Sequence, residues 1–348
     1  LGSNENILLK LDNFNELIIW NTSSSKNHQF IVSSLDTNDI LAGDVTLESR
    51  WSPYYLEQDL TIPLGKTLSI MDGVALRISD GVAIIIFGTL EASSAVLSST
   101  GLGDRWSGLV MESQYANLFL DETTLLEASP SIMFSGGNLV VDGGTISRSA
   151  SSRALIEVNE QVGGSFSLSN MRLTDGSGSC IDIIESTIQL HISNVEFYGC
   201  NGPSIRAENA NVAIDDVVIG EGSSDGLVLS SISGTIENID ALEFNGAGNI
   251  LKLDYINNDL SISNIVGTVG GSPGIAGSNN RALNIDLINL TGAPAIDFDY
   301  SSGIISDITL AGNGFGTAII SHHGRYSESL RLHGLDITNY AVGIDLHA

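Results

Sequence analysis

Large aliphatic residues return along this chain at nearly regular intervals and divide it into similar segments. The intervals between consecutive members of this aliphatic column are 21 to 26 residues. The column consists of Leu109, Ile132, Leu155, Ile181, Ile205, Leu227, Leu251, Ile275, Ile296, Ile319 and Ile344. A period in this range, with strand-like sequence inside each unit, is typical of a solenoid whose coils stack on one another. The pattern therefore predicts about 11 regular coils.

Each repeating unit contains three short apolar runs. The first carries the aliphatic column and usually follows a small residue, and the other two alternate apolar with polar positions. A single Asn or Asp separates those two runs at Asn170, Asn194, Asp216, Asn264 and Asp307. Asn and Asp tolerate the left-handed backbone conformation that a sharp corner between strands requires. Three strands per coil, with stacked strands about 4.8 Å apart, predict a parallel β-helix.

The opening part of the chain adds a resemblance to a known superfamily. The stretch SPYYLEQDLTIPLGKTLSIMDGVALRI at 52–78, then FGTLEAS at 87–93 and WSGLV at 106–110, are its most specific segments. They resemble the opening coils of the right-handed parallel β-helix (pectate-lyase-like) superfamily, found in secreted and cell-surface proteins of bacteria and archaea. The resemblance implies an all-β, right-handed parallel β-helix with N-terminal opening coils ahead of the regular ones. It implies a fold and no single reaction.

The regularity of the pattern also predicts the domain organisation. Residues 1–48 are less regular and are expected to form either an irregular N-terminal cap or the end of a preceding domain. Residues 49–348 are predicted to form one parallel β-helix. Because the last aliphatic position, Ile344, opens a fresh coil, we expect the β-helix to continue beyond residue 348 in a longer chain with flanking domains.

The charge balance restricts the classes of partner and the location. The chain has 41 acidic and 14 basic residues and a formal net charge of −27. Binding to a phosphate backbone needs a basic surface, so nucleic acid is excluded as a partner. The sequence has no stretch of about 20 apolar residues, so no transmembrane segment is predicted in this stretch. We predict an extracellular or cell-surface location, with other surface proteins or glycans as partners.

The two cysteines and two glycosylation sequons bear on that location. Cys180 and Cys200 fall in adjacent coils, but Cys200 lies four residues before the position that stacks on Cys180. The spacing therefore leaves open whether the pair forms a disulfide, which would indicate an oxidising compartment. Asn21 and Asn289 begin Asn-x-Ser/Thr sequons and are candidates for glycosylation.

Motifs that the superfamily resemblance would imply for an enzyme are largely missing. Asp215-Asp216 and His322-His323-Gly324-Arg325 only partly match the polygalacturonase motifs. The Asp-Pro-His motif of the uronate epimerases does not occur in the sequence, nor does the calcium-binding Gly-Gly-x-Gly-x-Asp repeat. The sequence leaves open whether the protein is an enzyme, but the missing motifs argue against catalysis.

One group of polar residues is nevertheless a candidate site. Residues one and three positions after the aliphatic column point outward from the coil, because side chains alternate along a strand. Near the C-terminus this face carries Asp297, Asp299, His322, Asp345 and His347. Imidazole with carboxylate suits zinc, and carboxylates alone suit calcium. The alternatives are a solvated polar face without a ligand, or acid–base chemistry by His322 with a neighbouring aspartate. We predict that the protein requires no cofactor, and that calcium or zinc could bind at this face.

Two functions from different classes remain. The first, which we favour, is a non-enzymatic extracellular or cell-surface scaffold, such as a surface-layer or adhesin stalk segment. The alternative is a carbohydrate-active enzyme, a polysaccharide lyase or glycoside hydrolase. Aromatic residues make up only 6% of the chain, so a long glycan track along the coils is disfavoured. Tyrosines at 198, 255, 300 and 326 could contribute singly to sugar binding.

Overall fold

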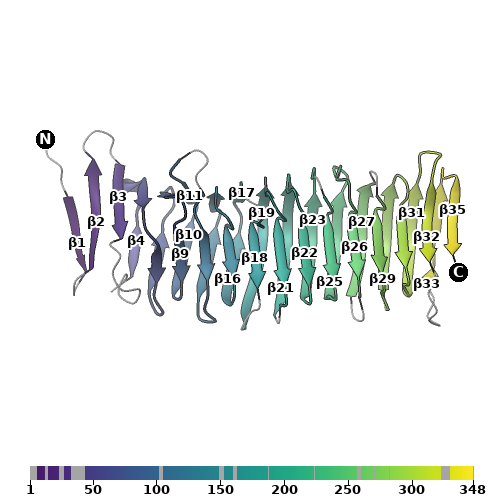
Figure 1. Ribbon diagram of the computed structural model, residues 1–348, viewed down its shortest axis with the longest axis horizontal. Coiled ribbons are helices and arrows are strands. Elements are labelled where there is room, and N and C mark those ends of the chain that lie inside the picture. The colour runs from purple at the N-terminus through teal and green to yellow at the C-terminus, as the bar shows by residue number, and fades with distance from the viewer. Residues whose placement is uncertain are drawn as a thin grey trace. The chain divides into compact units, whose positions relative to one another are not determined.

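The computed structural model shows a chain made almost entirely of β-strands, which pair in parallel from β4 onward (Figure 1). It describes residues 6–11, 15–22, 27–32, 44–101, 105–148, 153–159, 163–186, 188–222, 224–256, 260–269, 272–281, 283–322 and 330–347, the first three ranges by their backbone only. Strands make up 61% of the structure and form a β-solenoid of about 12 turns, which confirms the predicted parallel β-helix. Contacts divide the chain into two compact units, Leu1–Arg172 and Leu173–Ala348. Within the described ranges, no helix has the length and apolar character needed to cross a membrane.

The first unit begins with an antiparallel meander and continues with three parallel sheets. The meander consists of β1 (Asn6–Leu11), β2 (Asn15–Thr22) and β3 (Asn27–Val32). The first parallel sheet contains β4 (Val45–Leu47), β7 (Thr67–Ile70), β10 (Thr89–Ser93), β13 (Asn117–Asp121), β16 (Gly137–Asp142) and the start of β19 (Gly164–Thr174). The second contains β5 (Tyr54–Leu56), β8 (Ala75–Ile78), β11 (Val96–Ser99), β14 (Thr124–Leu126) and β17 (Thr145–Ser147). The third contains β6 (Leu60–Ile62), β9 (Ala83–Ile86), β12 (Gly108–Met111), β15 (Ile132–Phe134) and β18 (Ile156–Asn159), and a short 3-10 helix, η1 (Ser49–Trp51), precedes β5.

The second unit repeats one short and one long strand in each coil. The short strands are β20 (Ile181–Ile184), β22 (Ile205–Glu208), β24 (Leu227–Ser230), β26 (Leu251–Asp254), β28 (Ile275–Ser278), β30 (Ile296–Asp299), β32 (Thr317–His322) and β35 (Val342–His347). The long strands are β21 (Gln189–Tyr198), β23 (Asn211–Ile219), β25 (Ser233–Ala241), β27 (Leu260–Thr268), β29 (Leu283–Thr291) and β31 (Gly303–Ala311). The two shorter strands β33 (Leu330–Leu332) and β34 (Leu335–Thr338) both pair with β31.

Each long strand bends at one residue with a left-handed backbone. The five predicted corner residues all have positive φ angles, between 50° and 56°. Two further corners, Asn238 and Leu287, have φ angles of 56° and 53°. Leucine disfavours this conformation, so the Asn/Asp pattern did not predict a corner at Leu287, whose position is set by register with Asn264 on one side and Asp307 on the other. The bend divides one long strand into the two strands that the sequence predicts.

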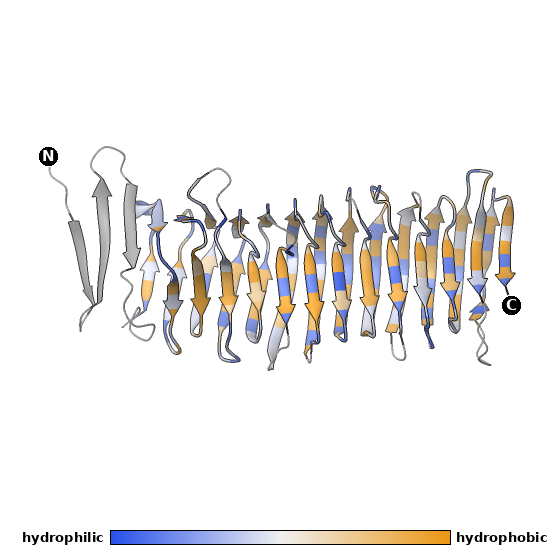
Figure 2. Cartoon of the chain, in the orientation of Figure 1, coloured by the Kyte–Doolittle hydropathy of each residue, from blue (hydrophilic) through white to orange (hydrophobic). Residues whose placement is uncertain are grey.

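Ten of the eleven members of the aliphatic column are buried, with one change of register, whereas Ile344 on β35 is 39% exposed. The members on β12 to β32 are at most 1% exposed, and Figure 2 shows the alternation of apolar and polar bands along the strands of the second unit. On β18, however, the residue that pairs with Ile132 is Ile156, and not the predicted Leu155. Both side chains are fully buried, so two adjacent apolar positions made the register ambiguous in the sequence. The column also extends back to Leu60 and Ile84 in the opening coils.

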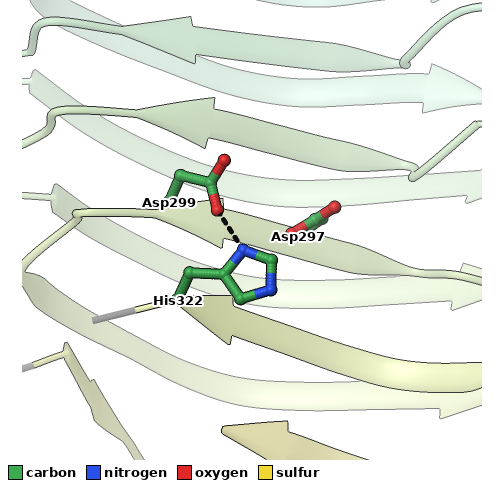
Figure 3. Close-up of side chains that lie close together, drawn as sticks. All are labelled: Asp297, Asp299 and His322. Atoms are coloured by element: carbon green, nitrogen blue, oxygen red, sulfur yellow. Dashed lines mark hydrogen bonds and ion pairs between the residues drawn. The ribbon is translucent and has the colours of Figure 1, made fainter. Parts of the chain in front are cut away.

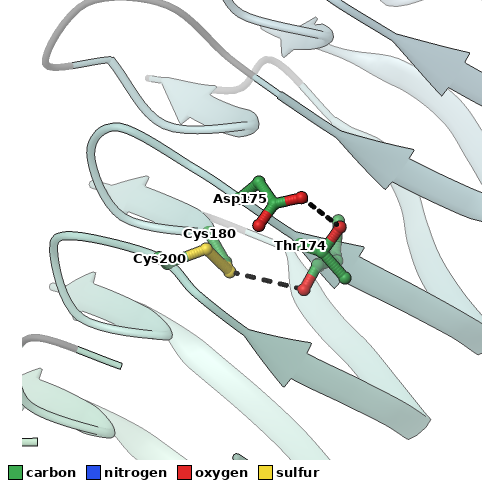
Figure 4. The surroundings of a disulfide bond; sticks show 5 residues. Thr174, Asp175, Cys180 and Cys200 are labelled. Atoms are coloured by element: carbon green, nitrogen blue, oxygen red, sulfur yellow. Dashed lines mark hydrogen bonds between the residues drawn. A yellow bond between two sulfur atoms is a disulfide. The ribbon is translucent and has the colours of Figure 1, made fainter. Parts of the chain in front are cut away.

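Cys180 and Cys200 form a disulfide between neighbouring coils of the second unit (Figure 4). Their Cα atoms lie 5.7 Å apart, within the usual range for a disulfide. Cys180 is fully buried and Cys200 is 5% exposed. Of the two sequon residues, Asn289 is exposed on β29, whereas the side chain of Asn21 lies outside the described part of the chain. Glycosylation at either residue stays a prediction, as does the domain boundary at residue 48.

Candidate functional site

Four neighbouring short strands, β26, β28, β30 and β32, place the candidate site on one outward face of the second unit. In successive coils Lys252 pairs with Ala276, which pairs with Asp297. Two residues further along, Asp254, Ser278, Asp299 and His322 occupy one row across the same four strands. Alternation along β30 buries Ile296 and Phe298 completely, so the aspartates between and after them are presented to solvent.

A surface groove of about 250 Å³ crosses this face. Its lining consists of Lys252, Asp254, Ala276, Gly277, Ser278, Asp297 and Asp299. The central strand, β28, contributes only small residues, whereas β26 and β30 on either side carry longer charged side chains. The groove therefore exists because a strand without large outward side chains lies between two strands that have them.

Asp254 is held firmly at one wall of this groove. Its Oδ1 atom accepts hydrogen bonds from the backbone N–H of Ser278 at 3.1 Å and from the Ser278 hydroxyl at 2.8 Å. Its other carboxylate oxygen lies 3.9 Å from the ammonium nitrogen of Lys252. Ser278 therefore holds one carboxylate oxygen, and the Lys252 charge lies near the other as a loose ion pair.

The opposite wall carries Asp297 and Asp299, which form a tighter cluster with His322 on the next strand, beside the groove (Figure 3). One side-chain ligand atom from each residue lies within 4.8 Å of the other two. His322 Nδ1 lies 2.5 Å from Asp299 Oδ1, so these two side chains are hydrogen-bonded. In contrast, Asp297 Oδ1 is buried without a hydrogen-bond partner among the described residues. The cluster thus contains one carboxylate that is hydrogen-bonded to an imidazole and one with an unsatisfied oxygen.

The environment of Asp297 raises its pKa above the ordinary value of 3.8. Burial is the largest cause, because a charged carboxylate loses favourable solvation. The nearby negative charge of Asp299 raises the pKa further, and His322 opposes both effects. Ionisation of Asp297 is therefore less favourable in the folded protein than in the unfolded chain.

We expect the Asp297→Asn variant to melt at a higher temperature than the wild type at about pH 7 in the presence of EDTA. Because the folded-state pKa is raised, the stability associated with protonated Asp297 is fully present below about pH 3.8 and is lost as the pH rises through the raised pKa. Asparagine keeps the shape without the charge, so its advantage should shrink toward about pH 3. Thermal melts across this pH range measure the difference, and an advantage that is independent of pH would contradict it. Replacing the exposed Asp336 on β34 by asparagine provides the control.

The structure gathers three of the five predicted ligands and separates the other two. Asp345 and His347, on β35, form their own pair with 3.1 Å between His347 Nε2 and Asp345 Oδ2. The His347 ring packs against His322 edge to face, with 4.7 Å between ring centroids. On the strand between them, Ile320 pairs with both Asp297 and Asp345. This apolar residue interrupts the row of carboxylates. The Asp345–His347 pair is therefore a neighbour of the cluster and not a part of it.

The residues of the other wall of the groove were not among the predicted site residues. Lys252 and Asp254 occupy the same outward positions as Asp297 and Asp299, two coils earlier. The signal that could have connected them is the IAGS sequence of β28, whose small residues leave the space between the two walls open. The corner residues Tyr255 and Tyr300, which directly follow Asp254 and Asp299, are 54% and 57% exposed.

Comparison with known proteins adds a fold-level similarity. No protein-family model matches the sequence, and no curated protein sequence matches it. Among solved structures, the A-module of the mannuronan C-5 epimerase AlgE6 from Azotobacter vinelandii is similar, with a TM-score of 0.39 and 13% identity over 92% of this chain and 89% of that chain. At this identity the similarity concerns the fold alone. By the register of its own strands, the chain is a parallel β-helix.

Proposed function

We propose that this protein is a non-enzymatic β-helix scaffold of the extracellular space or cell surface, which holds a short glycan segment in the groove between β26 and β30. The observation that supports this proposal is the groove itself, with charged walls, a floor of small residues and an exposed tyrosine at the corner beyond each wall. Carboxylates, an ammonium group and a serine hydroxyl are groups that form hydrogen bonds with sugar hydroxyls.

The two tyrosines have equivalent positions in their coils. Tyr255 and Tyr300 both take the left-handed conformation at the corner after the short strand, with φ angles of 56° and 49°. Asn279 occupies the same corner in the coil between them, with a φ of 56°. Two coil steps separate the tyrosines, or about 9–10 Å along the stack. Tyrosine offers an apolar ring face and a hydroxyl, which suits the mixed surface of a sugar ring.

The shape of the groove favours binding over catalysis. Repeat lengths of 21 to 26 residues leave little chain for an insertion that could close over the face. Enzymes commonly exclude water from the reacting groups by closing loops or domains, and a binding face needs no such cover. The Cys180–Cys200 disulfide supports an oxidising compartment, which agrees with an extracellular or cell-surface scaffold.

Binding to defined oligosaccharides tests this proposal. Calorimetry with cellohexaose, chitohexaose, oligogalacturonate and oligomannuronate is expected to detect at least one ligand. The Tyr255→Ala/Tyr300→Ala double variant should bind that ligand at least about tenfold more weakly, which corresponds to about 1.4 kcal/mol. Tyr115→Ala is the matched control, because Tyr115 is 61% exposed and belongs to the first unit. No binding to any of the four sugars, or equal binding by the double variant, would overturn the proposal.

A second candidate is a polysaccharide-active enzyme, favoured by the His322–Asp299 pair beside the groove. An imidazole held by a carboxylate can accept or donate a proton in general acid–base catalysis. Mass spectrometry of the same oligosaccharides after incubation would then reveal new products, which disappear in the His322→Gln variant. The control is Asp182→Asn on β20, since Asp182 pairs with Arg206 on the same face outside the groove. Intact sugars with every variant would favour the scaffold over the enzyme.

A further inference from the structure

We propose that Asp297, Asp299 and His322 form a binding site for one divalent transition-metal ion, with Zn²⁺ as the ion that best suits this set of ligands. The inference goes beyond glycan binding and does not depend on it. Its basis is the convergence of two carboxylates from one wall of the groove with the imidazole of the next strand, together with a buried carboxylate oxygen that has no hydrogen-bond donor among the described residues.

The backbone register brings the three ligands together. Asp297 and Asp299 lie on β30 two residues apart, and His322 is the direct neighbour of Asp299 on β32. Their potential ligand atoms are all within 4.8 Å of one another. Zinc binds nitrogen and oxygen ligands at about 2.0–2.2 Å, so the ligand atoms of a tetrahedral site are about 3.3–3.6 Å apart. Small rotations of exposed side chains close this difference, and the paired strands need not move.

Asp297 gives the cluster a specific need for a cation. A buried polar atom is normally hydrogen-bonded, and a buried charge is normally paired or coordinates a metal. Asp297 Oδ1 has no partner among the described residues, and the closest cationic side chain of the groove, Lys252, forms its ion pair with Asp254. A metal ion at this wall would satisfy the orphaned oxygen and offset the repulsion between Asp297 and Asp299.

The ligand chemistry favours zinc over calcium. Calcium takes six to eight oxygen ligands, whereas this wall supplies two carboxylates and a ring nitrogen. Imidazole with carboxylate is a common set for zinc, and three protein ligands leave a fourth position open to water or to a ligand in the groove. The ion would take the place of the hydrogen bond between His322 Nδ1 and Asp299 Oδ1.

Zinc binding by the purified protein, with no sugar present, tests the inference. Isothermal titration with ZnCl₂ after removal of metals by EDTA should show one ion per chain, and elemental analysis after dialysis should find the same ratio. His322→Ala and Asp299→Asn should each weaken binding by at least about tenfold, since even residues that only orient a ligand change metal affinity by about 10- to 100-fold. His191→Ala is the control, because His191 is exposed on β21 outside the cluster. Binding that is absent, or that persists unchanged in His322→Ala, would overturn the proposal.

A thermal measurement separates ligation from a structural role of these residues. Zinc should raise the melting temperature of the wild type, and this increase should be lost in Asp297→Asn. The same variant is expected to be more stable than the wild type in EDTA, so the order of the two proteins should reverse when zinc replaces EDTA. A residue that only supports the fold would give the same order in both conditions, and that result would count against the site. Failure to bind zinc leaves the sugar-binding result unaffected, so the two proposals can fail separately.

Discussion

Replacing Phe298 with alanine is expected to lower the free energy of unfolding by about 3–5 kcal/mol, the usual cost of removing a buried phenylalanine side chain. Phe298 is fully buried on β30 and pairs with Gly277 on β28. A Cβ atom at residue 277 would lie 3.0 Å from the Phe298 ring and would collide with the carbonyl oxygen of Leu253. Because Gly277 has no side chain, the Phe298 ring can occupy the space beside it. Any larger residue at position 277 would require the backbone to move.

The loss should extend to the candidate site, because Phe298 stands between Asp297 and Asp299 on the same strand. Chemical denaturation followed by circular dichroism measures the stability, and zinc titration measures the site. Phe315→Ala is the matched control, since Phe315 is 74% exposed and its replacement should change stability by no more than about 0.5 kcal/mol. A loss below about 1 kcal/mol for Phe298→Ala would show that the surrounding coils collapse into the cavity.

Removing the disulfide should be the second large change. The Cys180→Ala/Cys200→Ala variant is expected to lose about 3 kcal/mol, because the bridge closes a loop between residues 20 positions apart and restricts the unfolded chain. Both cysteines are buried, so the variant also loses packing in this coil. Thermal melts of the oxidised wild type and of the alanine variant provide the measurement.

Thiol alkylation under denaturing conditions is the necessary control. The wild type should contain no reactive thiol before reduction and two after it, since both of its cysteines are in the bridge. Wild-type protein that is reduced and alkylated should melt at a lower temperature than the oxidised protein. Equal melting of the oxidised wild type and the alanine variant would show that the bridge adds nothing to stability.

The outline of the fold could be predicted from the sequence because its determinants are local and repeated. A small residue followed by a large aliphatic one marks the start of a short strand, and Asn or Asp marks the corner between strands. Leu287 shows the limit of this reasoning, because it takes the left-handed corner conformation that its own side chain disfavours. The hydrogen-bonded register on both sides of β29 imposes that conformation. Pairing with β15 likewise decides that Ile156, and not Leu155, joins the aliphatic column.

Only the outward direction of the site residues could be predicted from the sequence, because it follows from alternation along a strand. Period-two alternation identified Asp297, Asp299 and His322 as outward residues of adjacent coils, and the structure places them in one cluster. It could not separate them from Asp345 and His347, because all five share the same outward rows. Side-chain direction decides that separation: His347 bonds to Asp345 and only packs against His322.

The sequence by itself determined the coil period, most strand and corner positions and the polarity of each face, because these depend on residue type and spacing along one coil. Tertiary structure alone decided which residues become neighbours across coils. It joined Cys180 to Cys200 despite their offset, and it placed the Lys252–Asp254 pair across an open groove from Asp297 and Asp299. The physical reason is that contacts between coils depend on the stagger of stacked strands and on the directions of side chains, and neither is recorded in the spacing of residues along the chain.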